Sequence, residues 1–126
     1  MDERLVKQVI VIRKDLKMRR GKEIAQAAHA SMSFLTKNMS EYKYIKPTDI
    51  QLEWIENHFT KVCLQVDSLE DLQQVAQNAE LADVECHVIT DKGATEFHGV
   101  PTITCLALGP DYADKIDAIT GNLKLY

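Results

Sequence analysis

A continuous run of β-branched residues, Val9-Ile10-Val11-Ile12, places the strongest constraint on how this chain can fold. Such runs are typical of strands that helices cover on both faces, as in α/β proteins. The next ten residues, 13–22, contain six lysines and arginines and a single acid. Because the whole chain carries a formal charge of −4, its positive charge is concentrated at this one turn.

The basic turn leads into a segment with helical periodicity, which we expect to span residues 20–38. Four polar residues fall in one stripe of this helix: Lys22, Gln26, His29 and Ser33. A mostly apolar stripe on the opposite side is expected to pack against the sheet, and it contains Ile24, Ala27, Ala28, Ser31, Phe34 and Leu35. The N-terminus of a helix that follows a buried strand favours anions, so the pattern predicts an anionic ligand. The alternative is a solvated basic loop before an ordinary amphipathic helix.

The rest of the chain alternates between strand and helix patterns, with a loop expected at residues 39–47. The expected strands are 7–13, 61–66, 84–90 and 102–108, the last of them stopped by Gly109-Pro110. Further helices are expected after the N-caps Thr48, Ser68 and Asp111, and the last is expected to end at Gly121. This order predicts an α/β fold, namely a three-layer α/β/α sandwich on a four-stranded, mostly parallel sheet, in a single domain of residues 1–126.

The composition is that of an ordinary globular protein, with 45% hydrophobic and 27% charged residues. No apolar run approaches the roughly 20 residues of a membrane span, and no apolar signal core follows the first residues. We therefore expect a soluble, cytoplasmic protein that does not associate with membranes.

The three cysteines, Cys63, Cys86 and Cys105, are widely spaced and lie in expected strands. An odd number without C-x-x-C spacing disfavours both a disulfide framework and a zinc site. We interpret all three as small buried hydrophobes and expect no metal or other cofactor. A nucleophile built from Cys86 and His87 is also disfavoured, because neighbours in a strand point to opposite faces.

Residues 91–101 form a long connection between two expected strands and contain two glycines, a proline and several polar groups. Hairpin loops are usually shorter, and long ordered loops often carry function. The alternative is a simple turn in which Asp91 accepts backbone hydrogen bonds.

Three motifs together carry a resemblance to a known family. The sequence KDLKMRRGKEIAQAAHA at residues 14–30 resembles the D-L-x-M-x-x-G-K-x-x-A-Q-x-x-H-A signature of the type 2 peptidyl-tRNA hydrolases. Asp91, Gly93 and Thr95 resemble the D-x-G-x-T loop of that family. TITCLALGP at residues 102–110 and ITGNLKL at residues 119–125 resemble its last strand and its closing segment.

The resemblance implies hydrolysis of the ester that links a peptide to the 3′ end of tRNA. It implies catalytic roles for Lys22, Asp91 and Thr104, a homodimer, and a mixed sheet with one antiparallel strand. Ester cleavage needs an activated water and a stabilised oxyanion. Asp91 is expected to orient or deprotonate the water, Lys22 to stabilise charge or donate a proton, and Thr104 to hydrogen-bond the water or the carbonyl.

A tRNA substrate fits the charge map, because phosphate contacts give affinity without sequence readout. The expected substrate-binding residues are Arg13, Lys14, Lys17, Arg19, Arg20, Gln26, His29 and Thr95. The loop departs from the common Ala-Gly-Arg-Thr-Gln form of the family at Ala94 and Glu96, which suggests a divergent, bacterial-type member.

Two other hypotheses stay open. One is a non-catalytic tRNA- or RNA-binding protein associated with translation on the same fold, which would bind tRNA without turnover. The other is a hydrolase of a different acylated anionic substrate, which would cleave small esters independently of the tRNA body.

Overall fold

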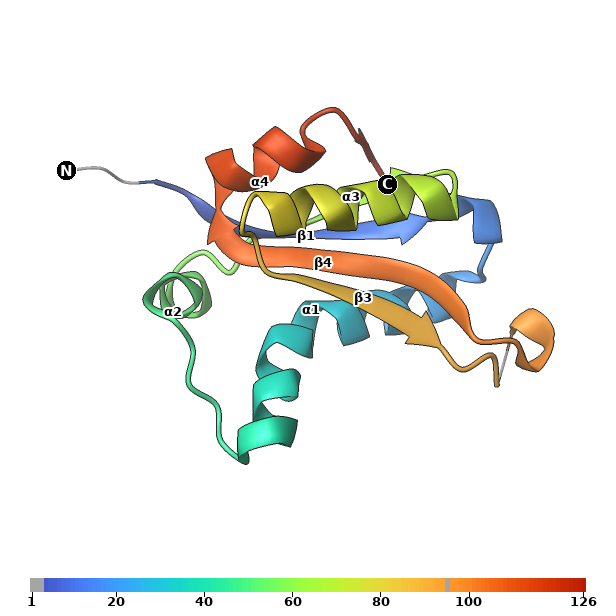
Figure 1. Ribbon diagram of the computed structural model, residues 1–126, viewed down its shortest axis with the longest axis horizontal. Helices are drawn as coiled ribbons and strands as arrows, with labels where there is room; N and C mark the ends of the chain where they lie inside the picture. The colour runs from blue at the N-terminus through green and yellow to red at the C-terminus, as the bar shows by residue number, and fades with distance from the viewer. Residues whose placement is uncertain (1–3, 95) are drawn as a thin grey trace.

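The computed structural model describes residues 4–94 and 96–126, which form a mixed five-stranded sheet in the order β3-β4-β1-β2-β5 (Figure 1). The strands are β1 (Val6–Arg13), β2 (Lys61–Val66), β3 (Cys86–Asp91), β4 (Thr102–Tyr112) and β5 (Lys124–Leu125). Neighbours β1 and β2 are parallel, whereas β1–β4, β3–β4 and β2–β5 are antiparallel.

The described part of the chain forms four α-helices around this sheet, with α1 and α2 below it and α3 and α4 above it in the view of Figure 1. Their bounds are α1 (Arg20–Tyr42), α2 (Asp49–Glu56), α3 (Leu69–Leu81) and α4 (Ala113–Thr120). Short 3₁₀ turns follow β1 at Lys14–Leu16 and precede β4 at Phe97–Gly99. Helix α2 packs against α1 through Phe34 and Trp54, whose ring centroids are 5.8 Å apart in an edge-to-face arrangement.

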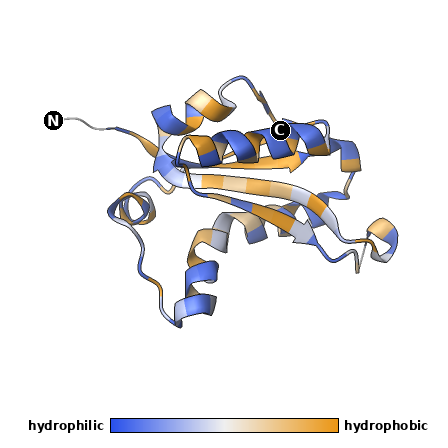
Figure 2. Cartoon of the chain, viewed as in Figure 1, coloured by the Kyte–Doolittle hydropathy of each residue, from blue (hydrophilic) through white to orange (hydrophobic). Residues whose placement is uncertain are grey.

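The β-branched run of β1 supplies both halves of the core. Val9 and Val11 lie in one apolar cluster with side chains of α3 and α4, while Ile10 and Ile12 lie in a second cluster with Ala30 of α1. Alternate side chains of a strand point to opposite faces, so a strand covered on both sides must be apolar throughout. Figure 2 shows this pattern as hydrophobic strands between helices whose outer surfaces are largely hydrophilic.

The expected sheet of four strands is wrong, because β5 adds a fifth strand beside β2. Only two residues long, β5 is too short to show a period-2 pattern. The expectation of a mostly parallel sheet is also wrong for the pairing of neighbouring strands. Strands β1, β2 and β3 share a direction, but β4 lies between β3 and β1, so β1–β2 is the single parallel pair in the described sheet.

The buried face of α1 differs from the expected apolar stripe. Its buried residues are Gln26, Ala30, Ser33 and Phe34, whereas Ile24 is 63% exposed. Two members of the polar stripe are buried with hydrogen-bond partners: the Ser33 hydroxyl donates to the carbonyl of His29 within α1, and Gln26 bonds to side chains of β3 and β4. The buried face of α1 therefore combines the apolar residues Ala30 and Phe34 with the hydrogen-bonded residues Gln26 and Ser33.

Several boundaries also differ from expectation. Helix α1 continues through residues 39–42 and is followed by the C-cap Lys43, which adopts a left-handed conformation with φ of 65°. Strand β4 continues through Gly109 and Pro110 to Tyr112, so these residues do not stop it. The N–H of Gly109 donates to the Glu85 carbonyl, which keeps this part of β4 paired. Asp111 does not cap α4, because its carboxylate accepts instead from the N–H of Tyr112.

Two predicted caps are confirmed. Thr48 and Gln51 form a reciprocal capping box at α2, and the Ser68 hydroxyl accepts from the N–H of Asp71 at α3. The expectation of three buried cysteines holds fully only for Cys105, since Cys63 on β2 is exposed. No helix in the described part of the chain has the length and apolar character needed to cross a membrane.

Candidate active site

The candidate site lies at the end of the sheet where β1 and β3 finish and β4 begins. This end is on the right-hand side of Figure 1. The chain leaves β1 through the basic 3₁₀ turn and enters α1 at Arg20. The carboxyl ends of strands and the N-terminus of a helix thus meet, as in many ligand sites of α/β proteins.

Lys22 and Asp91 form the centre of this site. The Lys22 Nζ lies 2.8 Å from Asp91 Oδ1, and their side chains are only 14% and 11% exposed. The second carboxylate oxygen, Oδ2, accepts from the N–H of Gly93 at 2.8 Å. The hydrogen bond from Lys22 is the largest cause of a lowered pKa of Asp91, so this carboxyl group is ionised at neutral pH.

Gly93 permits the turn that follows β3. Its φ is +83°, and a Cβ atom there would lie 2.6 Å from the carbonyl oxygen of Val100. The carbonyl of Gly93 also accepts from the N–H of Gly99 at 3.0 Å. Only glycine fits this backbone, which in turn aims an N–H at Asp91.

Gln26 connects the Lys22–Asp91 pair to β4. Its Nε2 donates to Asp91 Oδ1 at 3.3 Å, and its Oε1 accepts from the Thr104 hydroxyl at 2.5 Å. Thr104 is fully buried, and the Cys105 thiol lies 3.5 Å from the Gln26 carbonyl as a weak donor. The structure therefore brings Lys22, Asp91 and Thr104 together, with Gln26 between Asp91 and Thr104.

The basic residues of the turn are not equivalent. Arg13 pairs with Asp15 at 2.7 Å and donates to the carbonyl of Ile103 at 2.9 Å, so it joins β1 to the start of β4. Arg19 is 81% exposed at its side chain, and its Nε lies 3.1 Å from the Glu96 carboxylate. Lys17 and Arg20 are exposed beside it.

Two other predicted binding residues line hollows on the surface. Lys14 lines a separate hollow on the α3 side together with Asp67 and Asp71. His29 lines a groove between α1 and β3. Thr95 lies outside the described residues.

One contact near the site has no local sequence signal. The Tyr126 hydroxyl at the end of the chain donates to the carboxylate of Glu23 in the first turn of α1. This bond is the largest cause of a rise in the pKa of Tyr126 to about 12. The two residues are 103 positions apart in the sequence, so local sequence patterns do not predict this contact.

The described residues offer no grouping of three His, Cys, Asp or Glu side chains that could hold a metal ion. The site presents the ammonium group of Lys22, the carboxylate of Asp91, the amide of Gln26 and the exposed guanidinium group of Arg19. An ammonium–carboxylate pair beside a basic helix N-terminus suits an anionic substrate that undergoes acyl transfer to water.

The fold and the site thus define an α/β protein with a lysine–carboxylate centre next to an anion-binding turn. A family model described as peptidyl-tRNA hydrolase PTH2 matches residues 6–126. The chain belongs to this family.

Curated relatives match nearly their whole length. A peptidyl-tRNA hydrolase of Nanoarchaeum equitans is 43% identical over 97% of this chain and 100% of its own. One of Methanothermobacter thermautotrophicus is 41% identical over 95% of this chain and 99% of its own. Both organisms are archaea, so the expectation of a bacterial-type divergent member is not supported.

A solved structure of a protein of unknown function from Agrobacterium tumefaciens strain C58 has a similar fold. Its TM-score is 0.62, and the match covers 96% of this chain and 97% of that one at 14% identity. At this identity the likeness concerns the fold alone.

Proposed function

We propose that this protein hydrolyses the ester bond between a peptide and the 3′ end of tRNA, releasing the peptide and free tRNA. The observation that carries the proposal is the contact of Lys22 with Asp91 at 2.8 Å, in a chain that matches the family over residues 6–126. We place the protein in the cytoplasm, where peptidyl-tRNA arises, and treat its residues as one catalytic domain.

In the proposed mechanism, a water attacks the ester carbonyl, the C–O bond to the ribose breaks, and the proton that the water loses passes to the ribose oxygen, so the products are the peptide acid and the free ribose hydroxyl. Asp91 orients the attacking water through its carboxylate; its lowered pKa makes it a weak proton acceptor but a constant negative charge. The Lys22 ammonium group stabilises the oxyanion that develops on the carbonyl. Removing one such donor typically slows an acyl-transfer enzyme by about 10²–10³-fold.

We assign Thr104 a positioning role rather than contact with substrate. Its side chain is fully buried, and its hydroxyl donates a hydrogen bond to Gln26 Oε1. This bond turns the Gln26 amide nitrogen toward Asp91. A fixed amide holds the carboxylate in one orientation, so Thr104 acts on the reaction through Gln26.

The tRNA phosphates are proposed to bind at the exposed part of the basic turn, at Lys17, Arg19 and Arg20, beside the N-terminus of α1. Sequence-independent phosphate contacts suit an enzyme that acts on many tRNAs. Arg13 is already occupied by Asp15 and Ile103, so we assign it to the structure of the turn.

We further propose that two copies associate through the solvent-facing side of α1. Ile24 is 63% exposed, Met32 is 53% exposed and Met39 is 50% exposed, which together leave an apolar strip along this helix. Helices on both sheet faces otherwise support the three-layer α/β/α sandwich. Analytical ultracentrifugation tests the association: Met32→Glu should give monomers where the wild type gives dimers, and a monomeric wild type would refute it.

A non-catalytic tRNA-binding protein is the second candidate. It is favoured by the Arg19–Glu96 ion pair, because Glu96 places negative charge within the proposed tRNA face. The deciding experiment incubates the wild type with N-acetyl-aminoacyl-tRNA and, separately, with a small ester of the same acylated amino acid. Hydrolysis of the tRNA ester alone supports the proposal. Binding without hydrolysis supports the second candidate, and equal cleavage of both esters points to a general esterase.

A further inference from the structure

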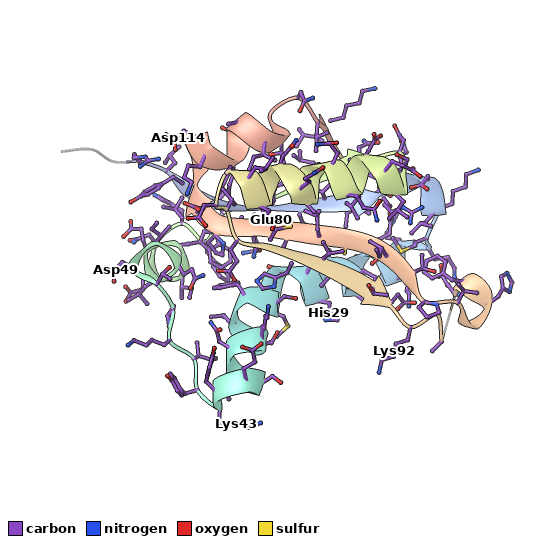
Figure 3. All side chains as sticks on the ribbon, in the orientation of Figure 1. His29, Lys43, Asp49, Glu80, Lys92 and Asp114 are labelled. Atoms are coloured by element: carbon purple, nitrogen blue, oxygen red, sulfur yellow. The ribbon has the colours of Figure 1, made fainter. Side chains whose placement is uncertain are left out.

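A groove of about 650 Å³ lies between α1 and β3, next to the candidate active site. Its lining comes from residues of α1 from His29 to Glu41 and from residues of β3 from Cys86 to Ile89. In Figure 3, His29 lies on α1 below β3, and Lys92 lies just beyond the end of β3. The volume falls within the roughly 300–1,000 Å³ that is usual for ligand sites.

One side of this groove is the free edge of the sheet. Strand β3 is the first in the order β3-β4-β1-β2-β5, so β4 is its one neighbour among the described strands. The Glu85 carbonyl accepts from Gly109 of β4, and backbone groups alternate in direction along a strand. The N–H and C=O groups of Cys86 and Val88 therefore point away from β4.

The groove lining comes within one helical turn of Gln26 on α1 and within three residues of Asp91 on β3. His29 follows Gln26 by three residues on α1, and Val88 precedes Asp91 by three residues on β3. At about 3.3 Å per residue, the outward backbone groups of Val88 lie roughly 10 Å from Asp91. An extended peptide with its last residue at Asp91 would span this distance with about three residues.

One groove side chain, His87, is linked to α2 through Glu85. His87 Nε2 lies 2.6 Å from the Glu85 carboxylate, which also accepts from Gln51 of α2 at 3.0 Å. These contacts position His87 in the groove lining. The groove lining includes Lys37 and Glu41, one charge of each sign, in contrast to the basic turn at the other end of the site.

We propose that this groove binds the peptide part of peptidyl-tRNA, which pairs as an added parallel strand with the free edge of β3. This inference rests on the proposed function. The basic turn is proposed to bind the tRNA. The bound peptide therefore extends from the ester on the other side of Lys22 and Asp91, along β3. Main-chain pairing recognises any peptide sequence, as a hydrolase of many peptidyl-tRNAs requires.

The test compares two substrates with the same esterified residue, N-acetyl-aminoacyl-tRNA and tetrapeptidyl-tRNA. We expect the wild-type kcat/KM to be about tenfold higher for the longer peptide, the effect of one or two backbone hydrogen bonds. Val88→Pro removes the outward N–H, a change that edge strands tolerate, and should bring the ratio of the two kcat/KM values close to one. Val88→Ala keeps the N–H and should keep the ratio.

A second arm uses the wild-type protein, so it does not depend on the folding of a variant. Methylation of the amide nitrogens in the tetrapeptide blocks strand pairing and should remove the tenfold gain. A wild-type ratio near one, or a gain that survives both Val88→Pro and amide methylation, overturns the groove proposal while leaving hydrolysis intact. If the wild type hydrolyses neither substrate, the proposed function itself fails and the groove proposal fails with it.

Discussion

Among single residues, Asp91 has the environment that matters most for the proposed reaction. Its carboxylate accepts from Lys22, from Gln26 and from the N–H of Gly93. The hydrogen bond from Lys22, together with the N–H of Gly93 and the charge of Lys22, lowers the pKa of Asp91, although burial opposes this shift. A group whose pKa is lowered by folding stabilises the folded state above its unfolded pKa, and this contribution is lost as pH falls through the folded pKa.

The first prediction concerns this titration. NMR of the side-chain carboxyl carbon should give an Asp91 midpoint below the ordinary value of about 3.9. In Lys22→Met the midpoint should rise, because the largest cause of the shift is removed. Lys92→Met, which changes an exposed lysine next to Asp91 in sequence, serves as the control. An Asp91 midpoint that is the same in the wild type and in Lys22→Met would contradict the assignment.

The second prediction concerns Thr104. Thr104→Val preserves shape but removes the hydroxyl, so the buried Gln26 Oε1 loses its donor at a cost of about 1–3 kcal/mol in the free energy of unfolding. We expect kcat to fall about tenfold with little change in KM, because the Asp91 carboxylate loses its fixed orientation. Thr104→Ser should restore most of kcat. If the valine and serine variants have the same kcat, the hydroxyl has no positioning role.

At the scale of elements, the loop after β3 sets the direction of Asp91. Gly93→Ala places a Cβ within 2.6 Å of the Val100 carbonyl oxygen, whereas a Cβ at Gly99 meets nothing within 4 Å although both glycines have positive φ. We expect Gly93→Ala to lower the free energy of unfolding by more than Gly99→Ala, whose cost should be about 1 kcal/mol, and to reduce kcat more strongly. Urea unfolding and steady-state kinetics measure both. Equal effects of the two substitutions would contradict the close-approach argument.

The elements also show what could be predicted from the sequence. The bounds 61–66 of β2 and the caps at Thr48 and Ser68 were predicted correctly because each depends on local alternation or local hydrogen bonds. The buried face of α1 and the pairing of β4 between β3 and β1 were not, because they depend on partners distant in sequence. Gln26 is buried on account of Thr104, 78 residues away, which no periodicity of α1 encodes.

The candidate site follows the same division. The resemblance singled out Lys22, Asp91 and Thr104, and the structure brings them together, although their roles stay predictions. From the sequence, both Arg13 and Arg20 were predicted to bind substrate, because both are basic residues of one turn. Their difference arises from Asp15 and the Ile103 carbonyl, which bind Arg13.

Across the whole molecule, exposed positive charge is concentrated at the basic turn, whereas the groove beside β3 carries one charge of each sign at Lys37 and Glu41. Exposed basic residues surround the N-terminus of α1, although the chain as a whole carries a formal charge of −4. Such an arrangement orients an anionic substrate without making the entire surface attractive to RNA. The salt dependence of binding should therefore come from a few residues.

Arg20 and Arg13 provide the matched pair for this prediction. Arg20→Ala should raise KM for the tRNA substrate and reduce the slope of log affinity against log salt by about one, because one phosphate contact is lost. Arg13→Ala should leave that slope nearly unchanged but lower the free energy of unfolding by about 1–3 kcal/mol, since the Ile103 carbonyl and Asp15 lose their partner. The reverse pattern would show that Arg13 is the phosphate contact.

The most direct measurement is single-turnover release of the N-acetyl-aminoacyl group from tRNA by the wild type, Lys22→Met and Asp91→Asn, with tRNA binding measured in the same samples. We predict that each substitution slows release by about 10²–10³-fold while tRNA affinity changes less than threefold. Lys46→Met, an exposed lysine in the loop before α2, should match the wild type in both measurements. Release at the wild-type rate in Lys22→Met or Asp91→Asn would show that the Lys22–Asp91 pair is not the catalytic centre.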